Sequence, residues 1–155
     1  MVKECVILIG AQATGESTFY RERFLRTHIR INLDMLRTRH REQRLVETCL
    51  EVGQSFVVDN TSPRRYDRNR YIGPANQHGF NVIGYYFQST FADAIRRNAK
   101  RPEDERVPEA GVRGTHAMLE DPSLDEGFDA LFYVTIDIKP GFVVEKWKNQ
   151  VLTTR

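Results

Sequence analysis

Short apolar runs alternate along the chain with longer stretches in which apolar residues recur every three or four positions. The runs predict buried strands, and the longer spacing predicts amphipathic helices that cover a sheet. The expected strands span residues 5–9, 28–33, 55–58, 80–87 and 128–136. The expected helices span residues 17–26, 35–52, 62–78, 90–99 and 108–119.

This alternation of strands and helices is typical of a parallel sheet with helices on both faces. We therefore expect a three-layer α/β fold built on a five-stranded, mainly parallel sheet. Residues 1–136 are expected to form this domain. The alternation stops there, so residues 137–155 are expected to be a C-terminal extension or a final helix.

Composition changes this picture little. The chain has 155 residues, 40% of them apolar and 28% charged, and its net charge is +2, which fits one globular domain and gives no bulk signal for nucleic acid. Cys5 and Cys49 suggest reduced core thiols, and the four histidines show no metal-ligand spacing. The first ten residues do not read as a signal peptide, and no window is apolar enough for a membrane, so a cytoplasmic location is expected.

A glycine-containing loop follows the first expected strand and opens the first expected helix. Its spacing matches the phosphate-binding pattern of two glycines five positions apart, then lysine, then serine or threonine. Backbone N–H groups of such a loop and the helix N-terminus favour anions, and the hydroxyl of Ser17 is placed to hold Mg²⁺. The candidate nucleotide-binding residues are Gly10, Ala13, Thr14, Gly15, Glu16, Ser17 and Thr18.

The loop departs from the pattern at Glu16, which stands at the lysine position. At about 4 Å and an effective dielectric near 20, a charge pair is worth roughly 4 kcal/mol before screening, and the exchange reverses its sign. We therefore expect weaker nucleotide binding and impaired phosphoryl transfer. Another cation, such as Lys100, is the alternative source of positive charge, but an inactivating change is the interpretation we favour.

The acceptor side is predicted at the ends of the second and third strands. Asp34 would take a proton from a hydroxyl, and Arg37, three residues later, would grip a neighbouring phosphate. The alternative for Asp34 is a helix N-cap. Asp59 follows an apolar strand and would hold Mg²⁺ through water, although loop capping explains it equally well.

Arginines gather in three further places. Arg97 and Arg101, beside a charged loop at residues 100–106, predict a lid that closes over a triphosphate, with a solvated helix end as the alternative. Two more basic stretches are either solvated faces or a groove for a polyanion. They comprise Arg37, Arg41 and Arg44 on one helix, and Arg64, Arg65, Arg68 and Arg70 on the next.

Together these motifs resemble the kinase domain of the polynucleotide 5′-hydroxyl kinase group within the P-loop kinases. The matching stretches are residues 10–18, 32–37, 57–61, 96–101 and 106–108, spread over roughly residues 4–136. The resemblance implies a P-loop kinase fold with a lid, and ATP and Mg²⁺ as cofactors. It also implies a nucleic acid 5′ end or a small phosphorylated molecule as acceptor.

The resemblance gives each candidate residue a role. Ser17 would be the metal-side hydroxyl, Asp34 the general base and Arg37 the residue that reads the acceptor's phosphate, while Arg97 and Arg101 would be lid cations on ATP. The family has its essential lysine where this chain has Glu16. Two other functions stay open: a small-molecule kinase, and a catalytically inactive module that binds nucleotide or nucleic acid.

Overall fold

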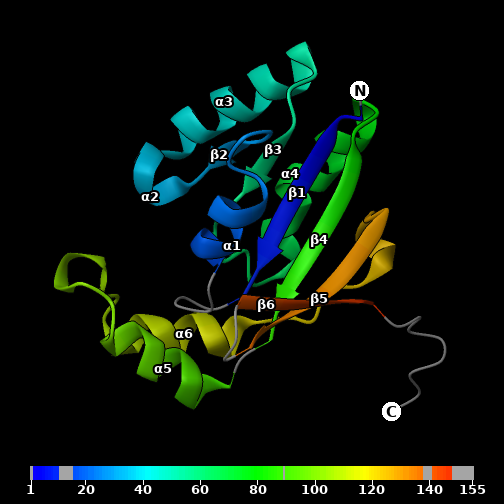
Figure 1. The fold of residues 1–155 in the computed structure, drawn as a ribbon. Coiled ribbons are helices and arrows are strands. Elements are labelled where there is room, and N and C mark those ends of the chain that lie inside the picture. Colours follow the sequence, from blue (N-terminus) through cyan, green and yellow to red (C-terminus); the bar gives the residue numbers. More distant parts are fainter. Residues whose placement is uncertain (1, 11–15, 89, 138–140, 148–155) are drawn as a thin grey trace.

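The central sheet has six strands in the order β2-β3-β1-β4-β5-β6 (Figure 1). The computed structural model describes residues 2–10, 16–88, 90–137 and 141–147. The strands are β1 (Glu4–Ile9), β2 (Ile29–Ile31), β3 (Phe56–Val58), β4 (Asn81–Phe87), β5 (Ala130–Asp137) and β6 (Gly141–Lys146). The first five run parallel, and β6 pairs antiparallel with β5.

Helices cover both faces of the sheet, as the sequence predicts. They are α1 (Glu16–Arg23), α2 (Leu33–Leu36), α3 (Arg39–Val52), α4 (Arg65–Gln77), α5 (Phe91–Ala99) and α6 (Glu109–Met118), with short 3₁₀ turns at Glu103–Glu105 and Leu124–Glu126. Successive residues of a strand point to opposite faces, so β1 supplies two separate cores. Cys5 and Ile7 pack with α3 and α4, whereas Val6 and Leu8 pack with α1. The α/β fold of three layers is therefore confirmed.

Two local features differ from the expectation. The helix expected over residues 35–52 is two helices, because Arg37 has a φ of 77° and Thr38 begins α3 as an N-cap whose hydroxyl accepts from the Arg41 N–H. A residue with positive φ cannot continue a right-handed helix. The expected extension contributes the sixth strand, β6, whose Phe142 and Val144 pack against the α1 side of the sheet.

Both cysteines are buried free thiols, as predicted. Burial raises the pKa of Cys49 above its ordinary value, which favours the inert neutral thiol. Within the described part of the chain, no helix is both long enough and apolar enough to cross a bilayer.

Candidate functional site

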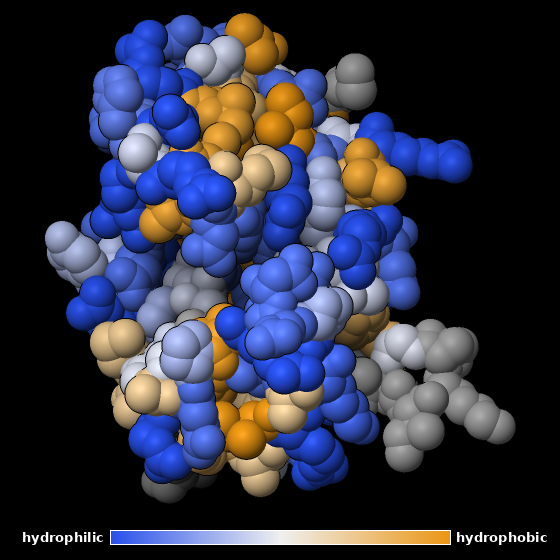
Figure 2. All heavy atoms as spheres, turned by 90° about the vertical axis from the view of Figure 1, so that its left-hand side faces the viewer, coloured by the Kyte–Doolittle hydropathy of each residue, from blue (hydrophilic) through white to orange (hydrophobic). Residues whose placement is uncertain are grey.

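A cleft of about 720 Å³ opens where β1, β2 and β3 end, below α2 and opposite the segment that joins α5 to α6. Parallel sheets hold ligands beyond the carboxyl ends of their strands because the connecting loops converge there. Figure 2 views the molecule from this side, where hydrophilic residues cover most of the surface around a hollow. The predicted residues that line the cleft are Glu16, Ser17, Thr18, Asp34, Asp59, Arg97 and Arg101.

The predicted phosphate loop is described only at its two ends. Gly10 is buried, and its N–H donates to the carbonyl of Thr61 over 3.0 Å, which ties the end of β1 to the loop after β3. Ala13, Thr14 and Gly15 lie outside the described residues. Glu16 begins α1, is only 8% exposed and lines the cleft beside Ser17. A carboxylate thus lies at the place where the nucleotide phosphates were expected.

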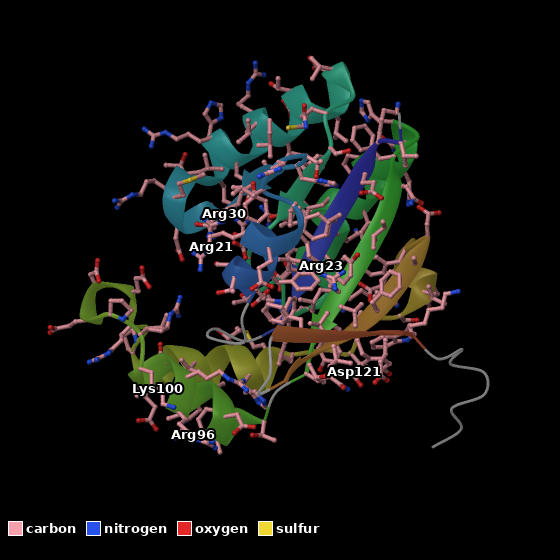
Figure 3. The ribbon with its side chains drawn as sticks, viewed as in Figure 1. Arg21, Arg23, Arg30, Arg96, Lys100 and Asp121 are labelled. Carbon is pink, nitrogen blue, oxygen red and sulfur yellow. The ribbon has the colours of Figure 1, made fainter. Side chains whose placement is uncertain are left out.

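Ser17, Asp59 and Arg30 form a hydrogen-bonded group at the end of β3. The hydroxyl of Ser17 donates to Asp59 Oδ2 over 3.0 Å, which brings together the two residues predicted to hold metal. Arg30, from β2, donates to the same Asp59 oxygen over 2.6 Å and to Ser17 Oγ over 3.1 Å. In the view of Figure 3, Arg30 lies between α1 and α2.

This group bears on the expected Mg²⁺. A serine hydroxyl and a carboxylate are the hard oxygen donors that Mg²⁺ binds at 2.0–2.1 Å. Here the guanidinium of Arg30 already bonds both oxygens, so Ser17 and Asp59 as arranged do not fit a directly bound divalent cation. The described residues hold no cluster of three or more His, Cys, Asp or Glu side chains suited to a metal ion.

The backbone around Asp34 is held by two asparagines. Asn32 is the N-cap of α2, and its side-chain oxygen accepts from the Met35 N–H over 2.9 Å. Asn32 also donates to the carbonyl of Asp59, and Asn60 accepts from the Leu33 N–H. The capping alternative for Asp34 is therefore wrong, because Asn32 performs that role. Asp34 lies exposed in the first turn of α2 and faces the cleft.

A buried carboxylate joins this loop to the helices behind it. Glu42, 1% exposed, accepts from the Tyr71 hydroxyl over 3.0 Å, from Arg39 over 2.7 Å and from Asn60 over 2.9 Å. Burial, followed by the negative charge of Glu42, raises the pKa of Tyr71 to about 12. The Tyr71 phenol therefore stays protonated and donates to the carboxylate.

Arg37 takes a different position from the one expected. It is the C-cap of α2, its backbone N–H donates to the Leu33 carbonyl, and its side chain is exposed. It does not line the cleft that Asp34 faces. The expected pairing of Asp34 with Arg37 on one helix face is wrong because the helix ends before Arg37; a role for Arg37 at a more extended acceptor stays a prediction.

The segment predicted to be a lid crosses the far side of the cleft. Arg97, in the last turn of α5, and Arg101, just beyond the C-cap of that helix, both line it. Asn98, 7% exposed, holds the returning chain by donating to the Val107 carbonyl over 2.6 Å and accepting from the Val107 N–H over 3.0 Å. Lys100, the C-cap of α5 (Figure 3), is exposed and is not among the residues that line the cleft.

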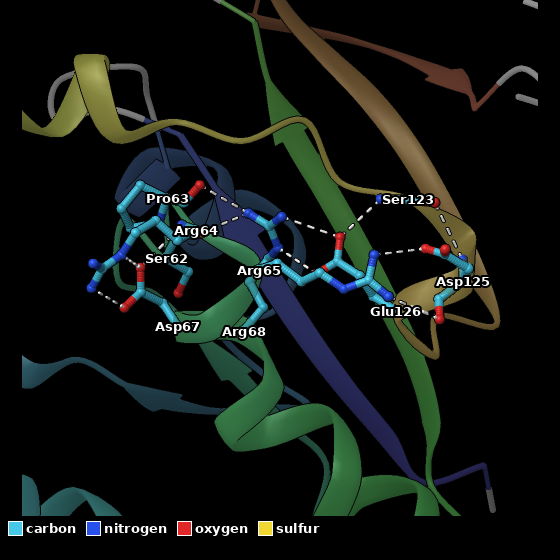
Figure 4. Close-up of polar contacts among 9 residues, drawn as sticks. All are labelled: Ser62, Pro63, Arg64, Arg65, Asp67, Arg68, Ser123, Asp125 and Glu126. Carbon is cyan, nitrogen blue, oxygen red and sulfur yellow. Dashed lines mark hydrogen bonds and ion pairs between the residues drawn. The ribbon is translucent and has the colours of Figure 1, made fainter.

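The second basic stretch is not a continuous surface. Arg68 is completely buried and forms an ion pair with Glu126 over 2.8 Å, as Figure 4 shows. The same guanidinium donates to the carbonyls of Ser62 and Pro63, both over 3.1 Å. Ser62 has a φ of 42°, an uncommon conformation that the surrounding contacts must hold. Arg68 therefore supports the loop that lines the cleft after Asp59.

The sequence did not point to Arg30 or Glu42, and it placed Arg68 in a basic stretch without indicating that this side chain is buried and paired. The available signal was a charged residue within an otherwise periodic element. Arg30 lies between two isoleucines of a strand, and Glu42 and Arg68 fall on the inward faces of helices. Charged residues are almost never fully buried unless they are paired. The sequence alone does not identify their partners, which are up to 58 positions away.

Residues 5–122 match the model of the AAA domain family. The putative bifunctional polynucleotide phosphatase/kinase of Acanthamoeba polyphaga mimivirus is 30% identical over 158 residues, covering 97% of this chain and 38% of that protein. The bifunctional polynucleotide phosphatase/kinase of Schizosaccharomyces pombe is 25% identical over 130 residues, covering 81% and 32% respectively. The chain thus spans about a third of the length of these curated relatives.

Solved structures agree on the fold. The crystal structure of AvrRxo1-ORF1 and AvrRxo1-ORF2 with ATP has a TM-score of 0.68 at 13% identity, covering 92% of this chain and 57% of that chain. At this identity the likeness shows the fold alone. Together with the family match, it confirms the expected P-loop kinase fold.

Proposed function

Because the chain belongs to the AAA domain family of P-loop proteins, we propose that its cleft binds ATP and is built for phosphoryl transfer to a hydroxyl acceptor. The observation that carries the proposal is one cleft lined by a helix N-terminus, two carboxylates from separate strand ends and two lid arginines. The acceptor we favour is a nucleic acid 5′-hydroxyl, since two of the curated proteins that the chain resembles are named polynucleotide phosphatase/kinases.

In the proposed transfer, the acceptor hydroxyl oxygen attacks the γ-phosphorus of ATP. The bond between this phosphorus and the β–γ bridging oxygen breaks, ADP leaves, and the acceptor's proton passes to the Asp34 carboxylate. Arg97 and Arg101 would neutralise the charge that develops on the phosphoryl oxygens. The side chains of Asp34, Arg97 and Arg101 perform these roles, and no step passes through a metal ion.

Glu16 favours a second candidate function, an inactive module that binds nucleotide or nucleic acid. Its carboxylate lines the cleft at the position that carries lysine in the phosphate-binding pattern. Repulsion between it and the phosphates would weaken ATP binding and remove stabilisation of the transition state. We therefore expect the chain as it stands to transfer phosphate poorly.

Transfer of labelled γ-phosphate to an oligonucleotide tests the proposal. We expect little product from the unchanged protein, and product from Glu16→Lys with a 5′-hydroxyl oligonucleotide but not with the same oligonucleotide already 5′-phosphorylated. In the Glu16→Lys background, Asp34→Asn should abolish transfer and spare ATP binding. ATP binding without transfer by Glu16→Lys would favour the inactive module, and transfer only to small alcohols would remove nucleic acid as the acceptor.

A further inference from the structure

Arg30 lies beside the cleft, bonded to two residues that line it, and the proposed transfer does not use it. It comes from the edge strand β2, and its side chain is 30% exposed, whereas the Asp59 side chain is 4% exposed. Its Nε donates to Asp59 Oδ2 over 2.6 Å and a second guanidinium nitrogen donates to Ser17 Oγ over 3.1 Å. The guanidinium thus bridges the two oxygens predicted to hold the metal.

The contact between Arg30 and Asp59 changes the net charge around Ser17 and Asp59. Asp59 carries one negative charge, and Arg30 balances it within hydrogen-bonding distance. A divalent cation bound directly to Ser17, and held by Asp59 through water as expected, would lie close to the guanidinium, and two like charges close together in a mostly buried place repel. The metal would also compete with two formed hydrogen bonds, both donated by the charged guanidinium and one of them only 2.6 Å long.

The positive charge of Arg30 also bears on phosphate binding. Glu16 stands where the phosphate-binding pattern has lysine, so the start of α1 lacks that cation. Arg30 supplies a cation beside Ser17, the next residue of the helix. A guanidinium has five N–H donors, and the contacts with Asp59 and Ser17 use two of them.

We propose that Arg30 is a built-in cation that takes the place of a divalent metal beside Ser17 and Asp59, so that nucleotide phosphates bind here without a metal ion. This inference rests on the proposed function for its ligand, a nucleoside triphosphate. The inference concerns the role of Arg30, and its test distinguishes a failure of that role from a failure of the proposed function.

Two titrations test it: Mn²⁺ binding followed by electron paramagnetic resonance, and ATP binding followed by calorimetry with Mg²⁺ or with EDTA. We expect Arg30→Gln to bind Mn²⁺ at least tenfold more tightly than the unchanged protein, and Arg30→Gln/Asp59→Asn to lose that gain. We expect the ATP affinity of the unchanged protein to differ by less than about threefold between Mg²⁺ and EDTA. In Arg30→Gln, affinity in EDTA should fall at least tenfold, and Arg30→Lys should restore most of it.

Arg26→Gln is the matched control, since it removes the same charge from an exposed position just after α1. It should leave both titrations unchanged, and thermal unfolding should show that every variant is folded. Equal Mn²⁺ affinity in the unchanged protein and Arg30→Gln would overturn the inference. If no variant binds ATP even when combined with Glu16→Lys, the proposed function fails, and the Mn²⁺ titration still decides the role of Arg30.

Discussion

The buried ion pair between Arg68 and Glu126 gives a sharp prediction, because the chain contains its own control. Arg68, in α4, is 0% exposed and Glu126 is 3% exposed. One turn earlier in the helix, Arg65 pairs with Asp125 over 3.0 Å, and there the side chains are 51% and 72% exposed. Both pairs join the same helix to the same 3₁₀ turn, as Figure 4 shows, so they differ mainly in burial.

Replacing either arginine by methionine keeps most of the side-chain volume and removes the charge. Arg68→Met leaves the Glu126 carboxylate buried without its guanidinium, and also strips the carbonyls of Ser62 and Pro63 of a donor. Removing one partner of a buried pair typically costs about 3–5 kcal/mol of unfolding free energy. Arg65→Met breaks a solvated pair, which is worth about 0–1 kcal/mol.

Urea unfolding measures both costs by linear extrapolation. We expect the free energy of unfolding to fall at least about 2 kcal/mol further in Arg68→Met than in Arg65→Met. The double variant Arg68→Met/Glu126→Leu should recover part of the loss, since no uncompensated charge remains buried. Equal losses for the two single variants would refute the reasoning that burial sets the strength of the pair.

Three further predictions follow from the cleft and its supports. Glu16→Lys should raise ATP affinity by at least about tenfold, equivalent to about 1.4 kcal/mol, whereas Glu22→Lys, the same change at an exposed position of α1, should not, as calorimetry would show. In Tyr71, a folded-state pKa near 12 above an unfolded value of about 10 means that the phenol adds stability below pH 10 that is lost between pH 10 and 12. Tyr71→Phe should flatten that part of the stability profile; an unchanged slope would count against the Glu42 network. Asn98→Ala should cost about 1–3 kcal/mol in thermal or urea unfolding by leaving both polar groups of Val107 without this side chain, and the exposed Asn76→Ala should cost less.

The layers of the fold could be predicted from the sequence because the apolar pattern records them directly. The runs at β1, β3 and β4 are buried in a parallel sheet and are recognisable as strands, and α3 ends at Val52, where the expected helix ends, with Gly53 as its C-cap at a φ of 75°. The break at Arg37 could not be predicted, because apolar spacing continues across it and the stop depends on Asn32 and Asn60 holding α2. Strand β6 was missed because it pairs with β5 outside the strand–helix alternation.

The candidate site could be predicted in part, for the same reason. Ser17, Asp34 and Asp59 follow strands, and the carboxyl ends of parallel strands meet, so their convergence was foreseeable. The positions of Arg30 and Arg68 depend on contacts between segments far apart in the chain. From sequence alone, the default interpretation of a basic residue is a solvent-exposed side chain. The sequence alone therefore does not predict the contacts between distant side chains that place these two arginines.

Hydrogen exchange during an ATP titration of Glu16→Lys tests the central claim most directly, that the cleft holds nucleotide phosphates. The account predicts saturable protection of backbone amides at the start of α1, in the loop after β3 and in the segment from Arg97 to Val107, all of which line the cleft. Saturable binding that protects other segments and leaves these unchanged would contradict it.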